Sequence, residues 1–212
     1  MIPFADIETV LFHIAEALRV PVLVAALLCL AWVLVELGRF LVELIGRRGR
    51  GYAVLQDATE QALVALGTRG DIGAAAVLLA PISTGPEMTA TIDRIVAQYG
   101  RPDRDEQGAK ALADFDFGAM RRLERTRALV RLGPALGLMG TLIPLSPALA
   151  GLAKGDVAQL SSNLRVAFSV TVLGLLIGAV AFVISLVRDR LYGQDLSDLE
   201  FVAARLLGTP PP

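Results

Sequence analysis

Two long uncharged stretches of this sequence contain hydroxyl side chains that could take part in chemistry. Thr141 and Ser146 belong to residues 132–153, and Ser169 and Thr171 to residues 166–187. A hydroxyl both donates and accepts hydrogen bonds, so it can ligate an ion or pass a proton. Hydrolysis would also need a base, but neither stretch holds a histidine or an acid to activate a nucleophile. The residues by themselves therefore give no support to an intramembrane hydrolase.

The composition excludes several other kinds of site. One cysteine, Cys29, and one histidine, His13, cannot form a Cys/His zinc site. The GxxxxGK[ST] motif of nucleotide-binding loops is absent. The formal net charge of −1 argues against nucleic-acid binding. We therefore expect no metal, no cofactor, no nucleic acid and no enzymatic activity.

Three apolar stretches are long enough to cross a membrane. Hydrophobic residues make up 54% of the 212 residues and charged residues 19%, and the mean hydropathy is +0.59. A span needs about 20 apolar residues, which predicts transmembrane helices at 18–46, 132–153 and 166–187. The first could instead be a cleaved signal peptide. However, no positive region precedes it and no small-residue cleavage site follows it, so we predict a retained span.

Positive charge predicts the orientation of the spans. Ten arginines flank them on one side: Arg47, Arg48, Arg50, Arg121, Arg122, Arg125, Arg127, Arg131, Arg188 and Arg190. The opposite side has Arg19, Lys154 and Arg165. The positive-inside rule places the N-terminal segment 1–17 and a loop at 154–165 outside. It places residues 47–131 and the tail 188–212 in the cytoplasm. We expect a multi-pass protein of the cytoplasmic (inner or plasma) membrane, N-out and C-in.

The segment predicted to be cytoplasmic is helical in pattern. Apolar residues recur at helical spacing over 52–66, 73–79, 86–99 and 105–131. The last range contains no proline to stop it from continuing into the second span. A short separate helix is predicted at 195–207. With no competing strand-like alternation, the sequence predicts an all-α integral membrane protein with long helical cytoplasmic extensions.

Small residues and prolines recur along the second and third spans. Glycines at this spacing allow two helices to approach closely, and prolines remove helix hydrogen bonds. The residues predicted to form the helix contact are Gly133, Pro134, Gly137, Gly140, Gly174 and Gly178. Tight packing of a helical hairpin would by itself explain these residues without any transport function.

Three charged residues follow one another along one face of the first helix. Glu36, Arg39 and Glu43 lie at i, i+3 and i+7, near the cytoplasmic boundary of the first span. Such charges commonly pair or extend to the membrane surface. The alternative is a polar contact between subunits near the cytoplasmic exit of an ion path.

The order of these residues resembles the MotA/TolQ/ExbB proton channel family. Gly133-Pro134 is followed by small residues and by Gly-Leu-Met-Gly-Thr-Leu at 137–142. After a short outer loop comes Ala-Phe-Ser-Val-Thr-Val-Leu-Gly-Leu-Leu-Ile-Gly-Ala at 167–179. This resembles the family's third-helix pattern of a threonine, two apolar residues and Gly-Leu. The resemblance runs from about Leu132 to about Val202, and the rest of the chain fits the family only in plan.

The resemblance implies a pentameric ring around the transmembrane helices of a single-span partner similar to ExbD, TolR or MotB. Proton or sodium flow would then move the partner relative to the ring, and the partner's intramembrane aspartate would carry the ion. Thr171 matches the family's third-helix threonine, and Pro134 and Thr141 match its second-helix proline and Gly-Thr. Ser169 and Ser146 are further candidates for the path, and membrane lipid is an expected partner.

Two positions depart from the family pattern. Leu132 stands where ExbB-like chains often have a threonine, and Val166 where they often have a glutamate. The predicted ion path therefore contains fewer polar side chains than the family's. Ser169 or Ser146 would substitute for these groups, or ion coupling differs or is lost. The competing function is a non-conducting oligomeric membrane scaffold, in which the glycines serve packing alone.

Overall fold

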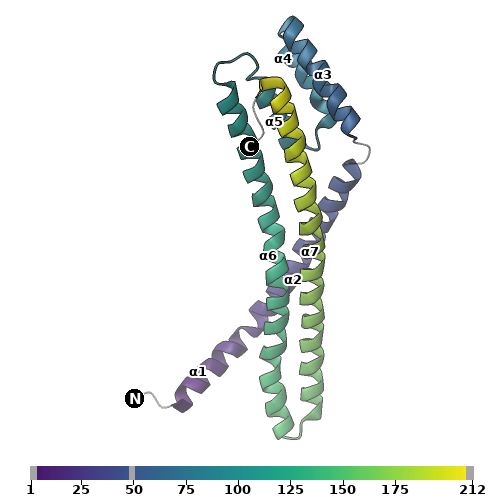
Figure 1. Ribbon diagram of the computed structural model, residues 1–212. Helices are drawn as coiled ribbons and strands as arrows, with labels where there is room; N and C mark the ends of the chain where they lie inside the picture. Colours follow the sequence, from purple (N-terminus) through teal and green to yellow (C-terminus); the bar gives the residue numbers. More distant parts are fainter. Residues whose placement is uncertain (1–3, 48–50, 209–212) are drawn as a thin grey trace. The chain divides into compact units, whose positions relative to one another are not determined.

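The computed structural model describes residues 4–47 and 51–208, and within them it contains helices and no strand (Figure 1). The prediction of an all-α fold is confirmed for these residues. In chain order the elements are α1 (Phe4–Ala17), α2 (Arg19–Gly46), α3 (Tyr52–Arg69), α4 (Ile72–Leu79), the 3-10 turn η1 (Ala80–Ile82), α5 (Pro86–Val96), α6 (Arg104–Ala153) and α7 (Val157–Leu207).

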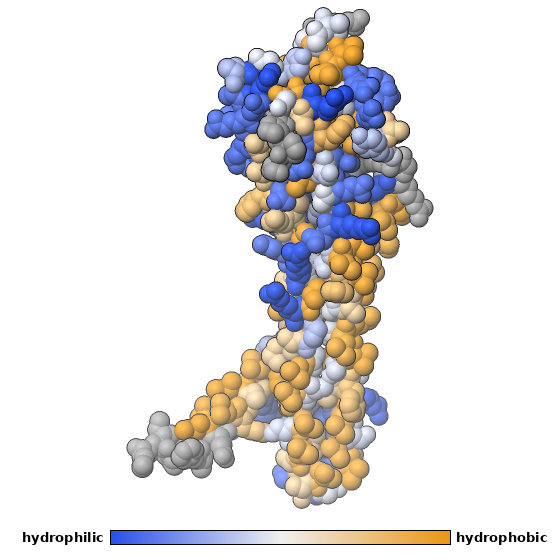
Figure 2. Space-filling model, in the orientation of Figure 1, coloured by the Kyte–Doolittle hydropathy of each residue, from blue (hydrophilic) through white to orange (hydrophobic). Residues whose placement is uncertain are grey.

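Among the described residues, three helical segments are long and apolar enough to span a membrane: Thr9–Gly46, which covers most of α1 and all of α2, Arg104–Ala153 and Val157–Leu207. Their apolar side chains are widely exposed, and Leu142, Phe168 and Val172 are each more than half exposed. Figure 2 shows mostly apolar side chains on this face of α6 and α7 near the turn that joins them. A surface of this kind is covered by lipid or by other apolar helices rather than by water. The prediction of a membrane protein with three such helices is confirmed.

The chain divides into two compact units, to each of which α2, α6 and α7 contribute. The first comprises residues 1–40 and 124–185, and the second comprises residues 41–123 and 186–212. The first unit holds α1 and the apolar parts of α2, α6 and α7, and the second holds α3, α4, η1 and α5.

In the first unit, α6 and α7 form an antiparallel hairpin whose backbones nearly touch. A Cβ atom added to Gly174 would lie 2.5 Å from the Gly133 carbonyl oxygen and 2.7 Å from the Gly137 Cα. One added to Gly178 would lie 2.9 Å from the Pro134 ring, and one on Gly140 would lie 2.2 Å from the Val170 side chain. All six residues of the predicted helix contact therefore lie at the α6–α7 interface.

The turn of this hairpin is shorter than the loop predicted at 154–165. Helix α7 already begins at Val157, where the Asp156 carboxylate accepts a hydrogen bond of 2.9 Å from the Gln159 backbone N–H. Gly155 adopts a left-handed φ of +78°, which favours glycine. The helix starts early because Asp156 supplies an acceptor to its first turn.

Helix α6 passes through three prolines without a break: Pro134, Pro144 and Pro147. Each proline lacks the N–H that would donate one helix hydrogen bond. The prolines therefore remove single hydrogen bonds, as expected, but do not end the helix. Helix α2 packs through a buried stripe of Val22, Ala26, Cys29, Val33, Glu36 and Phe40. Val22, Cys29 and Val33 of this stripe form a core with Leu129 and Leu136 of α6 and Ile177 and Ala181 of α7.

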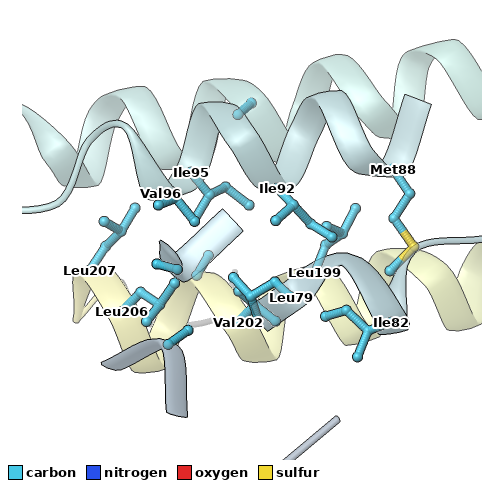
Figure 3. Close-up of a cluster of buried hydrophobic side chains, with 14 of the residues drawn as sticks. Leu79, Ile82, Met88, Ile92, Ile95, Val96, Leu199, Val202, Leu206 and Leu207 are labelled. Atoms are coloured by element: carbon cyan, nitrogen blue, oxygen red, sulfur yellow. The ribbon is translucent and has the colours of Figure 1, made fainter. Parts of the chain in front are cut away.

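In the second unit, α3, α4 and α5 enclose an apolar core together with parts of α6 and α7 (Figure 3). The side chains of Leu79, Ile92 and Ile95 are almost wholly buried there, as are Leu199 and Val202 of α7. The predicted helix at 105–131 is part of α6, and it continues into the apolar range as expected. Residues 195–207 are helical as predicted, but they are the last turns of α7 and not a helix of their own. Those residues belong to α7 because no proline interrupts it and its last turns bury Leu199, Val202 and Leu206.

Replacing Gly174 with alanine tests the close approach of α6 and α7. The added methyl group would overlap the backbone of Gly133 and Gly137, and overpacking of this kind costs about 1–3 kcal/mol. We expect the free energy of unfolding in detergent to fall by that amount.

Gly193→Ala on the same helix is the matched control, because a Cβ there meets no atom within 4 Å. It should be neutral or more stable by about 0.5–1 kcal/mol. Equal stability of the two variants would contradict the close contact.

Candidate functional site

The hydroxyl of Thr171 lies at the contact between α6 and α7. The side chain is half-buried, and its Oγ1 donates toward the Ala167 carbonyl at 3.1 Å and the Gly137 carbonyl at 3.3 Å. Gly137 allows this approach, because a Cβ there would lie only 3.4 Å from the Thr171 Cα. The predicted glycine contact thus positions the predicted hydroxyl.

Thr141 reaches the same carbonyl from the other helix. It is half-buried on α6, and its Oγ1 donates to the Leu138 carbonyl at 2.7 Å and toward the Gly137 carbonyl at 3.4 Å. The hydroxyls of Thr141 and Thr171 therefore converge on one backbone oxygen. The structure brings together these two residues of the predicted ion path.

Ser169 and Ser146 are both exposed and stand apart from this pair. Ser169 donates to the Arg165 carbonyl of its own helix at 2.8 Å. Ser146 lines a cavity of about 210 Å³ between α1 and α6, together with Phe12, Ala15, Glu16, Leu142, Ile143 and Pro147. Among the described residues, neither serine forms a hydrogen bond with the threonine pair, and their place in an ion path remains a prediction.

The charged residues of α2 are paired. Glu36 is 5% exposed, although it lies on the buried stripe of a largely apolar helix, and its carboxylate is 3.5 Å from the Arg39 guanidinium. Arg39 itself is largely exposed. Glu43, in the second unit, instead contacts Arg47 at 3.1 Å and Arg188 at 3.2 Å. This geometry favours pairing within the chain for all three residues.

The second unit contains an ion-pair network centred on Arg47 and Asp195. The Arg47 guanidinium donates to both oxygens of the Asp195 carboxylate, at 2.8 and 2.7 Å. Their side chains are only 11% and 4% exposed. In the sequence, Thr84 and Glu87 have the spacing of a capping box, which predicts that Thr84 caps the helix that follows. The Thr84 hydroxyl instead donates to Asp195 at 3.0 Å, and Gly85 is the N-cap of α5 without a side-chain bond.

Electrostatics keeps the Arg47 guanidinium protonated. Burial acts to lower its pKa, but the hydrogen bond and charge of Asp195 and the charge of Glu43 outweigh burial, and the pKa is raised. Two guanidinium groups lie near the Tyr192 ring, with Arg47 5.8 Å and Arg122 5.0 Å from its centroid. These distances allow cation–π attraction with both arginines.

Asp195 was not among the predicted site residues, although the sequence contains a signal for it. Arg188, Tyr192 and Asp195 stand at i, i+4 and i+7, and the same stripe continues through Leu199, Val202 and Leu206. An acid on an apolar stripe of this kind indicates a buried partner. The partner itself, Arg47, lies too far away in the sequence to be inferred from spacing.

These helices define an α-helical membrane protein with paired hydroxyls and no acid in its second and third apolar segments. Comparison with protein families adds one finding: the model of the MotA/TolQ/ExbB proton channel family matches residues 104–200. Over those residues the chain is similar to this family, as the sequence pattern predicts. The match covers all of α6 and most of α7, including Gly133, Thr141 and Thr171. No curated protein matches the chain.

Replacing Asp195 tests the ion-pair network. Asp195→Ala leaves the buried Arg47 guanidinium without its bidentate partner, and breaking a buried pair costs about 3–5 kcal/mol. We expect a loss of free energy of unfolding of that size, measured in detergent.

Arg205→Ala is the control on the same helix, because its 3.8 Å contact with Glu60 is half exposed. Exposed pairs contribute about 0–1 kcal/mol. A loss for Asp195→Ala no greater than that for Arg205→Ala would show that the network does not stabilise the fold.

Proposed function

We propose that this chain is a channel and motor subunit that, with a single-span partner, converts a transmembrane proton gradient into mechanical work. The observation that carries the proposal is the convergence of Thr141 and Thr171 on the Gly137 carbonyl. This convergence lies in the region that matches a proton channel family. A proton crossing a membrane interior needs polar groups within hydrogen-bond reach, and these two hydroxyls supply them.

The titrating acid comes from the partner in this proposal. Residues 132–153 and 166–187 contain no aspartate or glutamate, whereas proton transfer through a membrane needs a group that binds and releases the proton. An ExbD-, TolR- or MotB-like protein with an intramembrane aspartate would provide it. Five copies of this chain would surround the partner's helices and present Thr171, with Thr141 beside it, to the lumen.

The proposed location is the cytoplasmic membrane, with the N-terminus outside. The bias of arginines toward residues 47–131 and 188–212 supports this orientation. The turn at 154–156 then faces outward, and the second unit lies in the cytoplasm.

A non-conducting scaffold is the second candidate. It is favoured by one specific observation, that the Thr171 hydroxyl also serves the helix contact by bonding to the Gly137 carbonyl. A gene for a single-span protein with an intramembrane aspartate beside the gene for this chain would support the channel. Its absence would support the scaffold.

Cysteine labelling tests the orientation. Lys154→Cys and Glu106→Cys place exposed thiols in a Cys29→Ala background, and both sites avoid the left-handed glycines at 155 and 70. An impermeant maleimide applied to intact cells should label Lys154→Cys, but should label Glu106→Cys only after permeabilisation. The reverse pattern would overturn the N-out arrangement.

Thr171→Val tests the proposed ion path. Valine keeps the β-branched shape and deletes the hydroxyl, so the hairpin should still form while proton flux falls about tenfold or more. The tenfold value corresponds to the loss of about one hydrogen bond near 1.4 kcal/mol. Flux is measured with a pH-sensitive dye in proteoliposomes containing this chain and its single-span partner.

Thr171→Ser is the matched control, because it restores a hydroxyl and should retain part of the flux. Unchanged flux in Thr171→Val would remove this residue from the path. Absence of flux in the wild-type complex would instead support the scaffold.

A further inference from the structure

The cavity between α1 and α6 combines an apolar wall with two polar side chains. Its volume is about 210 Å³, whereas pockets for drug-sized ligands measure about 300–1,000 Å³, so it suits a small chemical group. Glu16 of α1 and Ser146 of α6 are its polar lining residues, and the apolar ones are Phe12, Ala15, Leu142, Ile143 and Pro147. This composition favours a ligand with an apolar body and one polar end.

The two polar side chains of the cavity are available to a ligand. Among the described residues, neither Glu16 nor Ser146 forms an ion pair or a hydrogen bond. Ser146 differs in this from Thr141 and Ser169, whose hydroxyls donate to carbonyls of their own helices. A carboxylate only accepts hydrogen bonds, whereas a hydroxyl accepts and donates. The cavity therefore presents one anionic acceptor and one hydroxyl.

Pro147 adds a third acceptor to the cavity wall. In a continuous helix the N–H of residue 147 would donate to the carbonyl of Ile143, but proline has no N–H. The Ile143 carbonyl therefore lacks its helix donor, and both residues line the cavity. Inside a membrane a backbone acceptor without a donor is costly. A ligand that donates hydrogen bonds would satisfy this carbonyl.

The register of the α6–α7 hairpin gives the level of the cavity. A Cβ atom on Gly140 would meet Val170, and one on Gly151 would meet Gln159. Each step along α6 is therefore matched by one step back along α7. Ser146, about midway between the two glycines, lies at the level of the α7 residues midway between Val170 and Gln159.

Those α7 residues are polar and mark the membrane interface. They include Asn163 and Arg165, and the uncharged stretch of α7 begins directly after them at residue 166. Arg19, at the start of α2, donates to Asn163 at 3.1 Å. Charged and amide side chains at the end of an apolar stretch lie at the depth of lipid headgroups. The cavity is therefore within reach of a headgroup.

We propose that this cavity binds the ammonium group of an aminophospholipid, such as phosphatidylethanolamine, in the leaflet on the side of the α6–α7 turn. A primary ammonium carries one positive charge and three N–H donors. It complements the Glu16 carboxylate by charge, and the Ser146 hydroxyl and the Ile143 carbonyl accept its remaining hydrogen bonds. This binding requires neither ion transport nor a partner chain.

Arg19 suits the phosphate of the same lipid. Its guanidinium has five N–H donors, and among the described residues it bonds to Asn163 alone. Glu16 and Arg19 stand three residues apart, yet in the described part of the chain they form no ion pair with each other. A zwitterionic headgroup matches this separation of charge, because its ammonium and its phosphate lie at opposite ends.

Lipid titration of the purified full-length chain in detergent tests the inference, with bound lipids counted by native mass spectrometry. We expect phosphatidylethanolamine to bind about tenfold more tightly than phosphatidylcholine with the same acyl chains, because a trimethylated ammonium has no N–H to donate. Glu16→Gln should weaken phosphatidylethanolamine binding about tenfold or more, and should leave phosphatidylcholine binding unchanged.

Two matched controls accompany these variants. Glu124→Gln removes the same charge from an exposed site at the other end of α6 in this unit and should leave both affinities unchanged. Pro147→Ala returns a donor to the Ile143 carbonyl and should weaken phosphatidylethanolamine binding about threefold or more. Pro144→Ala is its control, because Pro144 is not among the described residues that line the cavity.

Three results would overturn the inference. Equal affinities of the wild-type chain for the two lipids would indicate a cavity that holds acyl chains alone. Equal losses in Glu16→Gln and Glu124→Gln would show that net charge explains the effect. Absence of bound phosphatidylethanolamine would assign the cavity to another occupant, such as a second copy of this chain. Each of these results leaves the proposed function standing, because that function is tested by proton flux.

Discussion

The first unit depends on the contact between the backbones of α6 and α7 at their glycines. Gly133 and Gly174 leave no room for a Cβ atom, and one added to Gly137 would lie 3.3 Å from the Thr171 carbonyl oxygen. The lack of side chains at these glycines brings the Gly137 carbonyl within reach of a hydroxyl on the opposite helix. In a membrane, apolar side chains gain little by leaving lipid for each other, so close packing and interhelical hydrogen bonds must hold helices together. The glycine contact between α6 and α7 provides both the close packing and an interhelical hydrogen bond. The same contact positions Thr141 and Thr171.

The second unit is held by a different balance of forces. Its apolar core is formed by the short helices α3, α4 and α5, which pack against the ends of α6 and α7. The unit also contains buried charged side chains, among them Arg47 and Asp195. Such charges lose hydration, and the net gain from pairing them is small. Their geometry is nevertheless specific, since Asp195 meets two guanidinium nitrogens and one hydroxyl. We infer that these bonds define which residues of the segment after α2, of α7 and of the segment before α5 face each other.

Sequence reasoning succeeded where a single periodic or compositional signal decides the outcome. The three apolar helices follow from length and hydropathy, and the contact of Gly174 with Gly133 follows from glycine spacing. It failed where contacts with residues distant in the sequence outweigh a local sequence signal. Thr84 does not cap α5, because Asp195, 111 residues further on, accepts its proton. Residues 195–207 do not form a separate helix, because the core beneath Leu199 and Val202 favours continuation of α7.

The short turn at Lys154–Asp156 has a consequence for the rotational phase of the hairpin. An α-helix turns by about 100° per residue. Because Asp156 and Gly155 fix where α7 begins, they also fix which side of α7 faces α6. One inserted residue there would rotate the helix by more than a quarter turn and carry Gly174 away from Gly133. Helices can tolerate many changes on their lipid-facing sides, but the length of this connection is as constrained as the glycines themselves.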